Sequence, residues 1–213
     1  MFQALRLEVM DRFTAVERHF QQSRRLRGDP SVTAKGLVFI QIYAIHEYAA
    51  RNVARIAANA IAAHALPYAR LQSSLLALFL DPELSSLRDC GSDKIWDRRI
   101  GLFDRAVSQD PISLSAVPLP MDGTHFRHTH LELILKVFGV SRKLTLRRRH
   151  LYRIDEVVDN RNSIAHGEKT PEEVGQRYSR QDVFIIIRQM KAICLRLILI
   201  VSESCADPTK HCR

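Results

Sequence analysis

One short stretch of this 213-residue chain holds side chains that could do acid–base chemistry on a phosphate. It covers residues 161–167 and reads Arg-Asn-Ser-Ile-Ala-His-Gly. Histidine exchanges a proton near neutral pH. Arginine holds a phosphate through two parallel hydrogen bonds, and asparagine can orient either group. Together they suit RNA cleavage by attack of the ribose 2′-hydroxyl on the adjacent phosphate, which needs proton transfer and charge stabilisation but no external nucleophile.

The spacing of these residues on a helix indicates how they point. Ile154, Val158 and Arg161 follow steps of four and three, so Arg161 should point toward the core side. Asn162 and His166 lie one turn apart and can converge on one small group. Arg161 and His166 are five residues apart, about 140° around an ideal helix. They converge only if the arginine reaches, if the helix changes near its end, or if a second chain completes the site.

A purely structural interpretation stands beside this one. Arg161 could pair with a buried acid, while His166 caps the helix end that Gly167 creates. A similar choice applies to Glu47, which lies among apolar neighbours on an earlier helix. It could pair with Arg51 one turn on, or it could reach inward to a buried cation.

The start of the helix that carries the stretch is strongly basic, with Arg147, Arg148 and Arg149 in succession. Positive charge at a helix N-terminus opposes the macrodipole. A compensating anion would relieve this, either Asp155 or Glu156 or a nucleic-acid phosphate. We therefore assign the three arginines as candidate RNA contacts.

Neither a metal nor a cofactor is predicted. Asp122, His125, His128 and His130 are close in sequence, but they lack the one-turn spacing of a helical zinc site. Contact with a polyanion or a partner suits this segment better. The four cysteines form no Cys-x-x-Cys pair, and no signal peptide precedes them, so we expect reduced thiols and a cytoplasmic location.

Composition favours a soluble, basic, RNA-binding type of protein. Lys and Arg number 32 against 23 Asp and Glu, which gives a net charge of +9 and a pI near 9.8. Such a balance favours polyanions, namely RNA, DNA or an acidic membrane surface. The most apolar run, residues 183–201, is interrupted by Arg188, Lys191 and Arg196, so no membrane span is predicted.

The elements that must position the stretch are predicted to be helices, in an all-α domain over residues 1–204. Residues 205–213 are expected to be a flexible tail, and prolines make 110–129 a long loop. Ser179 and Asp182 resemble a capping box before the last helix. Apolar periodicity predicts helices over residues 2–27, 33–65, 68–80, 92–108, 130–138, 146–167 and 179–204.

The stretch from Arg161 to His166 resembles the Arg-x4-His motif of HEPN domains. The following Gly167, the long helical hairpins before it and the capped helix after it are similar to one branch of uncharacterised bacterial HEPN proteins. The similarity covers most of the chain and is strongest from about Gly123 to Val201. Gly123-Thr124 stands where this branch has Gly-Asn, so the loop differs there.

The resemblance implies a HEPN-like helical bundle, usually a homodimer, in which two motifs meet at a composite site. It implies a metal-independent endoribonuclease that leaves 2′,3′-cyclic phosphate and 5′-hydroxyl ends, often a toxin of a toxin–antitoxin pair or a phage-defence effector. Arg161 and His166 then become the catalytic residues, Asn162 their polar helper and Glu47 a supporting acid. The alternative is a non-catalytic binding or oligomerisation module in a multi-protein defence system. A DNA-binding regulator rests on charge alone.

Overall fold

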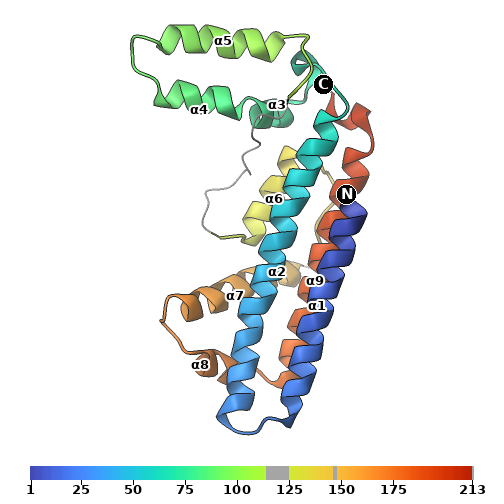
Figure 1. Cartoon of the computed structure of the whole chain (residues 1–213), viewed down its shortest axis with the longest axis vertical. Coiled ribbons are helices and arrows are strands. Elements are labelled where there is room, and N and C mark those ends of the chain that lie inside the picture. The colour runs from blue at the N-terminus through green and yellow to red at the C-terminus, as the bar shows by residue number, and fades with distance from the viewer. Residues whose placement is uncertain (114–124, 146–147, 213) are drawn as a thin grey trace. The chain divides into compact units, whose positions relative to one another are not determined.

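The computed structural model describes residues 1–113, 125–145 and 148–212, with the side chain of Arg148 left out. Within these residues the regular elements are all helices, which confirms the all-α prediction (Figure 1). The α-helices are α1 (Phe2–Gln22), α2 (Asp29–Ala62), α3 (Ser73–Phe79), α4 (Asp81–Asp89), α5 (Ile95–Val107), α6 (His128–Val137), α7 (Arg148–Ala165), α8 (Pro171–Gln176) and α9 (Arg180–Cys205). Three 3₁₀ turns are η1 (Ser23–Arg25), η2 (Tyr68–Arg70) and η3 (Pro208–His211).

The described chain divides into two compact units. The first unit takes residues 1–53, 123–131 and 143–199, and the second takes 54–122, 132–142 and 200–213. The stretch at 161–167 therefore belongs to the first unit. Each unit is assembled from three separate segments, so the division does not follow the chain. The single domain over residues 1–204 remains a prediction.

The core of the first unit forms where α1 meets the early part of α9. α1 buries one apolar face at steps of three or four, as its periodicity predicts: Leu5, Val9, Phe13, Val16 and Phe20. The rings of Phe20 and Phe184 lie 4.9 Å apart. Arg180 donates to the Phe20 carbonyl at 2.5 Å, so the start of α9 is tied to the end of α1 by polar as well as apolar contacts.

α8 packs closely on α2 because two glycines leave room. A Cβ added at Gly36 would lie 1.9 Å from the Pro171 carbonyl oxygen, and one at Gly175 would lie 2.0 Å from the Val32 carbonyl oxygen. No side chain larger than hydrogen fits either place without moving the backbone. The two helices therefore contact through backbone, which fixes where the chain runs after α7.

Caps define the ends of the elements around α7. Thr170 and Glu173 form a reciprocal capping box at the start of α8. Ser179 and Asp182 do the same before α9, since each side chain accepts a hydrogen bond from the other residue's backbone N–H. The predicted capping box is confirmed.

In the second unit, α4 and α5 lie side by side (Figure 1). The predicted helix over 68–80 is instead η2 and α3. α4 was not predicted, because Asp81-Pro82 was expected to end a helix. Pro82 lies in the first turn of α4, where a backbone N–H has no helical partner and proline is tolerated.

The C-terminal residues contact the start of α3. The Gln72 backbone N–H donates to the His211 carbonyl at 2.9 Å, and the Gln72 side chain donates to the Lys210 carbonyl at 2.6 Å. His211 is buried. Residues 208–212 thus have defined partners in the structure. The expectation of a flexible tail over 205–213 did not foresee these contacts.

Part of the predicted loop at 110–129 lies outside the described residues, including Gly123 and Thr124. At its start, Ile112 donates to the Leu66 carbonyl. At its end α6 begins at His128, two residues earlier than predicted. None of the described helices is long and apolar enough to cross a membrane, and the four cysteines are free thiols.

Candidate functional site

Arg161 lies in the last turn of α7, and its guanidinium is held from two directions. Its carbon centre lies 4.6 Å from the ring centroid of Tyr43, which comes from α2. One guanidinium N–H donates to the Asn162 side-chain oxygen at 2.9 Å. Ile154 and Val158, on the same side of α7, are fully buried. The ring and the amide thus restrain the arginine, and its remaining N–H groups make no hydrogen bond to another described residue, so they can serve a ligand.

Tyr43 connects Arg161 to Glu47. Tyr43 and Glu47 lie one turn apart on α2, and burial together with the negative charge of Glu47 raises the pKa of Tyr43 above its ordinary value. Glu47 forms an ion pair with Arg51 at 2.9 Å. The structure thus shows the Arg51 pair, the first of the two alternatives for Glu47, and places the acid beside the tyrosine that holds Arg161.

His166 follows the last residue of α7 and is exposed. Its backbone N–H donates to the Asn162 carbonyl at 2.9 Å, and Gly167 takes a φ of +74°, a left-handed conformation that glycine adopts easily. The imidazole makes no hydrogen bond to another described residue. Asn162 therefore contacts the two candidates differently, through its side chain to Arg161 and through its backbone to His166.

The other sides of α7 are fastened by polar contacts. Asp155 accepts a hydrogen bond from the His128 backbone at 3.1 Å and contacts His128 Nδ1 at 2.6 Å. Asp159 pairs with Arg127 at 2.6 Å. These pairs hold residues 127–128 against the middle of α7. His128, one of the predicted loop histidines, thus has a carboxylate partner.

A polar network around the buried Asn160 fixes the same helix from the side of α8. Asn160 donates to the Tyr178 hydroxyl at 2.8 Å, and that hydroxyl donates to Glu156 at 2.7 Å. Burial, with Glu156 as hydrogen-bond acceptor, raises the pKa of Tyr178 to about 12. Its hydroxyl therefore stays protonated near neutral pH and serves as a structural donor. Glu156, one of the acids expected to compensate the arginines at 147–149, pairs with Arg153 in the structure.

The chain matches a known protein family over most of its length. The model of the HEPN_MAE_28990-like HEPN family matches residues 6–203. The chain belongs to this HEPN family. The match runs from α1 nearly to the end of α9 and includes the whole Arg-x4-His stretch. Searches of curated proteins and of solved structures each returned no match.

The predicted RNA contacts of this HEPN chain are only partly described. Arg147 lies outside the described residues, α7 begins at Arg148, and Arg149 is exposed. A cavity of about 540 Å³ lies between the start of α7 and α9. Its described lining includes His150, Arg188 and Arg196 but no carboxylate. The region therefore has the charge that a phosphate needs, and the α9 arginines were not predicted to take part.

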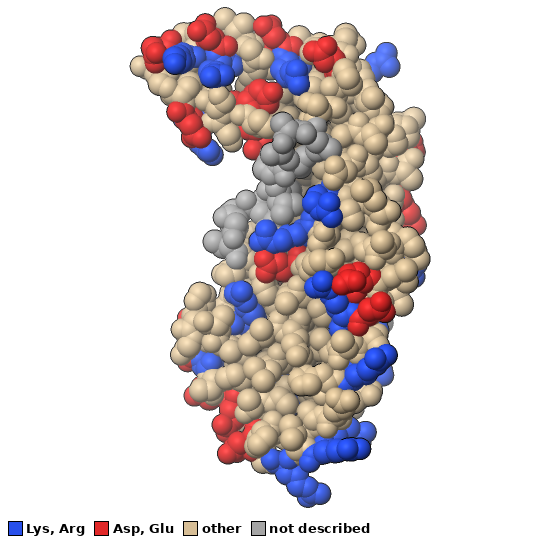
Figure 2. Space-filling view, in the orientation of Figure 1, with Lys and Arg blue, Asp and Glu red and all other residues tan. Residues whose placement is uncertain are grey.

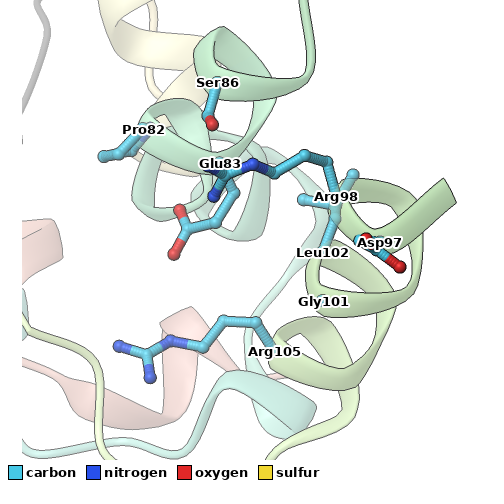
Figure 3. A pocket seen from close by; sticks show the side chains of 8 residues that line it. All are labelled: Pro82, Glu83, Ser86, Asp97, Arg98, Gly101, Leu102 and Arg105. Atoms are coloured by element: carbon cyan, nitrogen blue, oxygen red, sulfur yellow. The ribbon is translucent and has the colours of Figure 1, made fainter. Parts of the chain in front are cut away.

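A second cavity of the HEPN chain, about 470 Å³, borders the opposite side of α7. Its described lining holds the carboxylates of Asp155, Glu156 and Asp159 and the basic side chains of Lys169 and Arg177. Its charge is unfavourable for a phosphate. A third cavity, about 380 Å³, lies between α4 and α5. Glu83, Arg98 and Arg105 are among the residues that line it (Figure 3).

The charged side chains on the face drawn in Figure 2 are not gathered in one place. Figure 2 shows Lys and Arg on this face in several separate groups, with Asp and Glu among them. The described residues contain no group of three His, Cys, Asp or Glu side chains placed to hold a metal ion. Tyr43, Asn160 and Tyr178 were missed by sequence reasoning. Only Tyr43 carried a signal, its position one turn before Glu47 on the same helix face.

Proposed function

We propose that this HEPN chain is a metal-independent endoribonuclease, with Arg161 and His166 as its catalytic residues. The observation that supports this best is their contrast in setting. The Arg161 guanidinium is restrained by Tyr43 and Asn162, whereas His166 stands exposed just beyond the helix end. A restrained cation and an accessible imidazole are the two groups that this phosphate chemistry requires.

In the proposed reaction the ribose 2′-hydroxyl loses its proton and its oxygen attacks the adjacent phosphorus. The bond from phosphorus to the 5′-oxygen breaks, and that oxygen takes up a proton. The products carry 2′,3′-cyclic phosphate and 5′-hydroxyl ends. Arg161 donates to the non-bridging oxygens, where negative charge grows in the transition state. His166 moves one of the two protons.

Arg161 and His166 lie about 140° apart around an ideal helix, so one copy alone brings them together poorly. We propose that His166 of a second copy acts on the phosphate that Arg161 of the first copy binds, in a homodimer with a composite site, while water exchanges the other proton. Asn162 acts as positioning residue for Arg161, and Glu47 supports it through Tyr43. Residues 147–149, with Arg188 and Arg196, bind RNA phosphates. A role as a toxin or a phage-defence effector, with or without a partner protein, fits such an activity.

The test is cleavage of a single-stranded RNA in the presence of EDTA, with analysis of the product ends. His166→Ala should lower the cleavage rate by about 10²- to 10⁴-fold. His19→Ala, at another exposed histidine, should cleave like the parent chain. If His166→Ala cleaves as fast as the parent while both bind RNA, the protein is a binding module of the alternative kind and the proposal is wrong.

A further inference from the structure

α5 presents a stripe of large apolar side chains to solvent, which we call the α5 stripe. Its members are Trp96, Ile100, Phe103 and Val107, with 67%, 57%, 68% and 66% of their surface exposed. They follow steps of four, three and four, so they lie along one side of the helix. No residue of α5 is buried. A contiguous apolar side of this kind ordinarily marks a contact surface.

The opposite side of α5 is already occupied within the second unit. Arg98, Leu102 and Arg105 face α4 across the small cavity (Figure 3). Arg105 also stacks on the Tyr68 ring at 4.7 Å and donates to its hydroxyl at 3.4 Å. These contacts fix the rotation of α5 about its axis. The α5 stripe therefore faces away from α4, and turning it inward would break them.

The order of residues in the stripe is that of a two-stranded parallel coiled coil. In heptad terms Ile100 and Val107 take the a positions, and Trp96 and Phe103 take the d positions. β-Branched residues at a favour two parallel helices. The aromatic d residues replace the usual leucine and add apolar area.

The charges beside the stripe distinguish parallel from antiparallel pairing. Arg99 takes the g position and Asp104 the next e position. In a parallel pair, g of one helix faces the following e of the other, so Arg99 of each copy lies opposite Asp104 of the other copy. An antiparallel pair would instead place Asp97 of one copy beside Asp104 of the other, which is repulsive. The edges are thus complementary only in the parallel arrangement.

We propose that α5 is an interface for a second copy of this chain, with the two α5 helices parallel and in register. Each stripe residue then meets its own counterpart, and two Arg99–Asp104 pairs flank the apolar contact. The surface lies in the second unit, whereas the composite site proposed above uses α7 of the first. The interface stands whether or not the chain cleaves RNA. Because the stripe has only four layers, pairing is weak and depends on concentration.

The chain reports on this interface by itself, because Trp96 is its single tryptophan. Raising the protein concentration should move the Trp96 emission to shorter wavelength and reduce its quenching by iodide, while sedimentation shows the larger species. Arg99→Asp or Asp104→Arg each turns both flanking pairs repulsive, and each should weaken association roughly tenfold. An equimolar mixture of the two variants regains two attractive pairs and should associate like the parent.

Arg98→Asp is the matched control, since it changes the same charge on the side of α5 that faces α4. It should leave the concentration dependence unchanged. Tighter association of Asp104→Arg would indicate an antiparallel pair and overturn the proposal. A Trp96 emission that does not change with protein concentration would also overturn the proposal. The same holds if the emission shifts only when anionic phospholipid vesicles are added. Circular dichroism of each variant checks that the helices are intact.

Discussion

At the scale of single residues, the candidate site depends on how Arg161 is held. An arginine on a helix end samples many rotamers, and ordering it costs free energy each time a phosphate binds. Tyr43 and Asn162 order it beforehand. Preorganisation of this kind lowers the barrier without any extra contact to the substrate.

Replacing the ring of Tyr43 should therefore slow the proposed cleavage. A cation–π contact is worth about 0.5–2 kcal/mol depending on solvation, so Tyr43→Leu should lower the cleavage rate by roughly 3- to 30-fold. Tyr43→Phe keeps the ring and should stay within about twofold of the parent. Cleavage assays at saturating RNA, with melting curves for each variant, compare the two. Equal rates for leucine and phenylalanine at this position would mean that the ring does not hold Arg161 during catalysis.

The role of Tyr43 shows a limit of sequence reasoning at this scale. The Arg-x4-His spacing and the core-facing side of α7 could be predicted, because both depend on neighbours within two turns. The contact between Arg161 and Tyr43 joins residues from two helices far apart in the chain. It depends on how α2 and α7 approach each other, which periodicity does not specify. Asn160 is buried for a similar reason, since its partner Tyr178 lies after α8.

At the scale of elements, the apolar face of a helix was predicted well where the helix buries one face and less well where it meets several neighbours. α1 has one buried face, and the apolar periodicity of its sequence predicts that face correctly. α2 has 34 residues. Its apolar residues Leu37 and Ile40 are exposed, whereas Phe39 and His46 are buried. A helix that packs on different partners along its length has no single apolar stripe, so one periodic pattern misplaces part of it.

His46 gives α2 a pH-dependent contribution to stability. Its Nε2 lies 2.7 Å from the Phe126 carbonyl oxygen and its Nδ1 lies 3.9 Å from Cys194 Sγ. Burial lowers the pKa of His46 below its ordinary value of 6.5, despite the nearby charges of Glu47 and Asp155. The unfolded chain therefore binds a proton at higher pH than the folded chain does. The free energy of unfolding should fall as the pH drops through 6.5 toward the folded pKa.

We predict that His46→Gln flattens this fall between about pH 7 and 5.5, although it also lowers stability at pH 7. Urea unfolding at a series of pH values measures the slope for parent and variant. His19→Gln, at an exposed histidine of α1, should leave the slope unchanged. An identical slope for His46→Gln and the parent would mean that another group controls the acid sensitivity.

At the scale of the whole molecule, fold class and family were predictable because they rest on patterns that span the chain. Helical periodicity recurs from α1 to α9, and the motif lies near the end of an all-α sequence, as the family match over residues 6–203 bears out. The path of RNA was not predictable. The net charge of +9 indicates that polyanions are attracted, but on the face drawn in Figure 2 the basic side chains lie in several groups rather than along one band.

The proposed composite site can be tested by mixing two inactive variants of the chain. If Arg161 of one copy acts with His166 of the other, Arg161→Ala and His166→Ala chains should each be nearly inactive. In a mixed dimer one of the two sites then takes both intact residues. With random exchange half of the dimers are mixed, so an equimolar mixture should recover about a quarter of the parent activity. RNA cleavage after co-refolding or subunit exchange measures this recovery.

A chain that carries both substitutions is the control. Mixed with either single variant, it should recover no activity, because no site then receives an intact pair. Recovery in that control would point to contaminating nuclease, and no recovery in the main mixture would place both residues of each site on one chain.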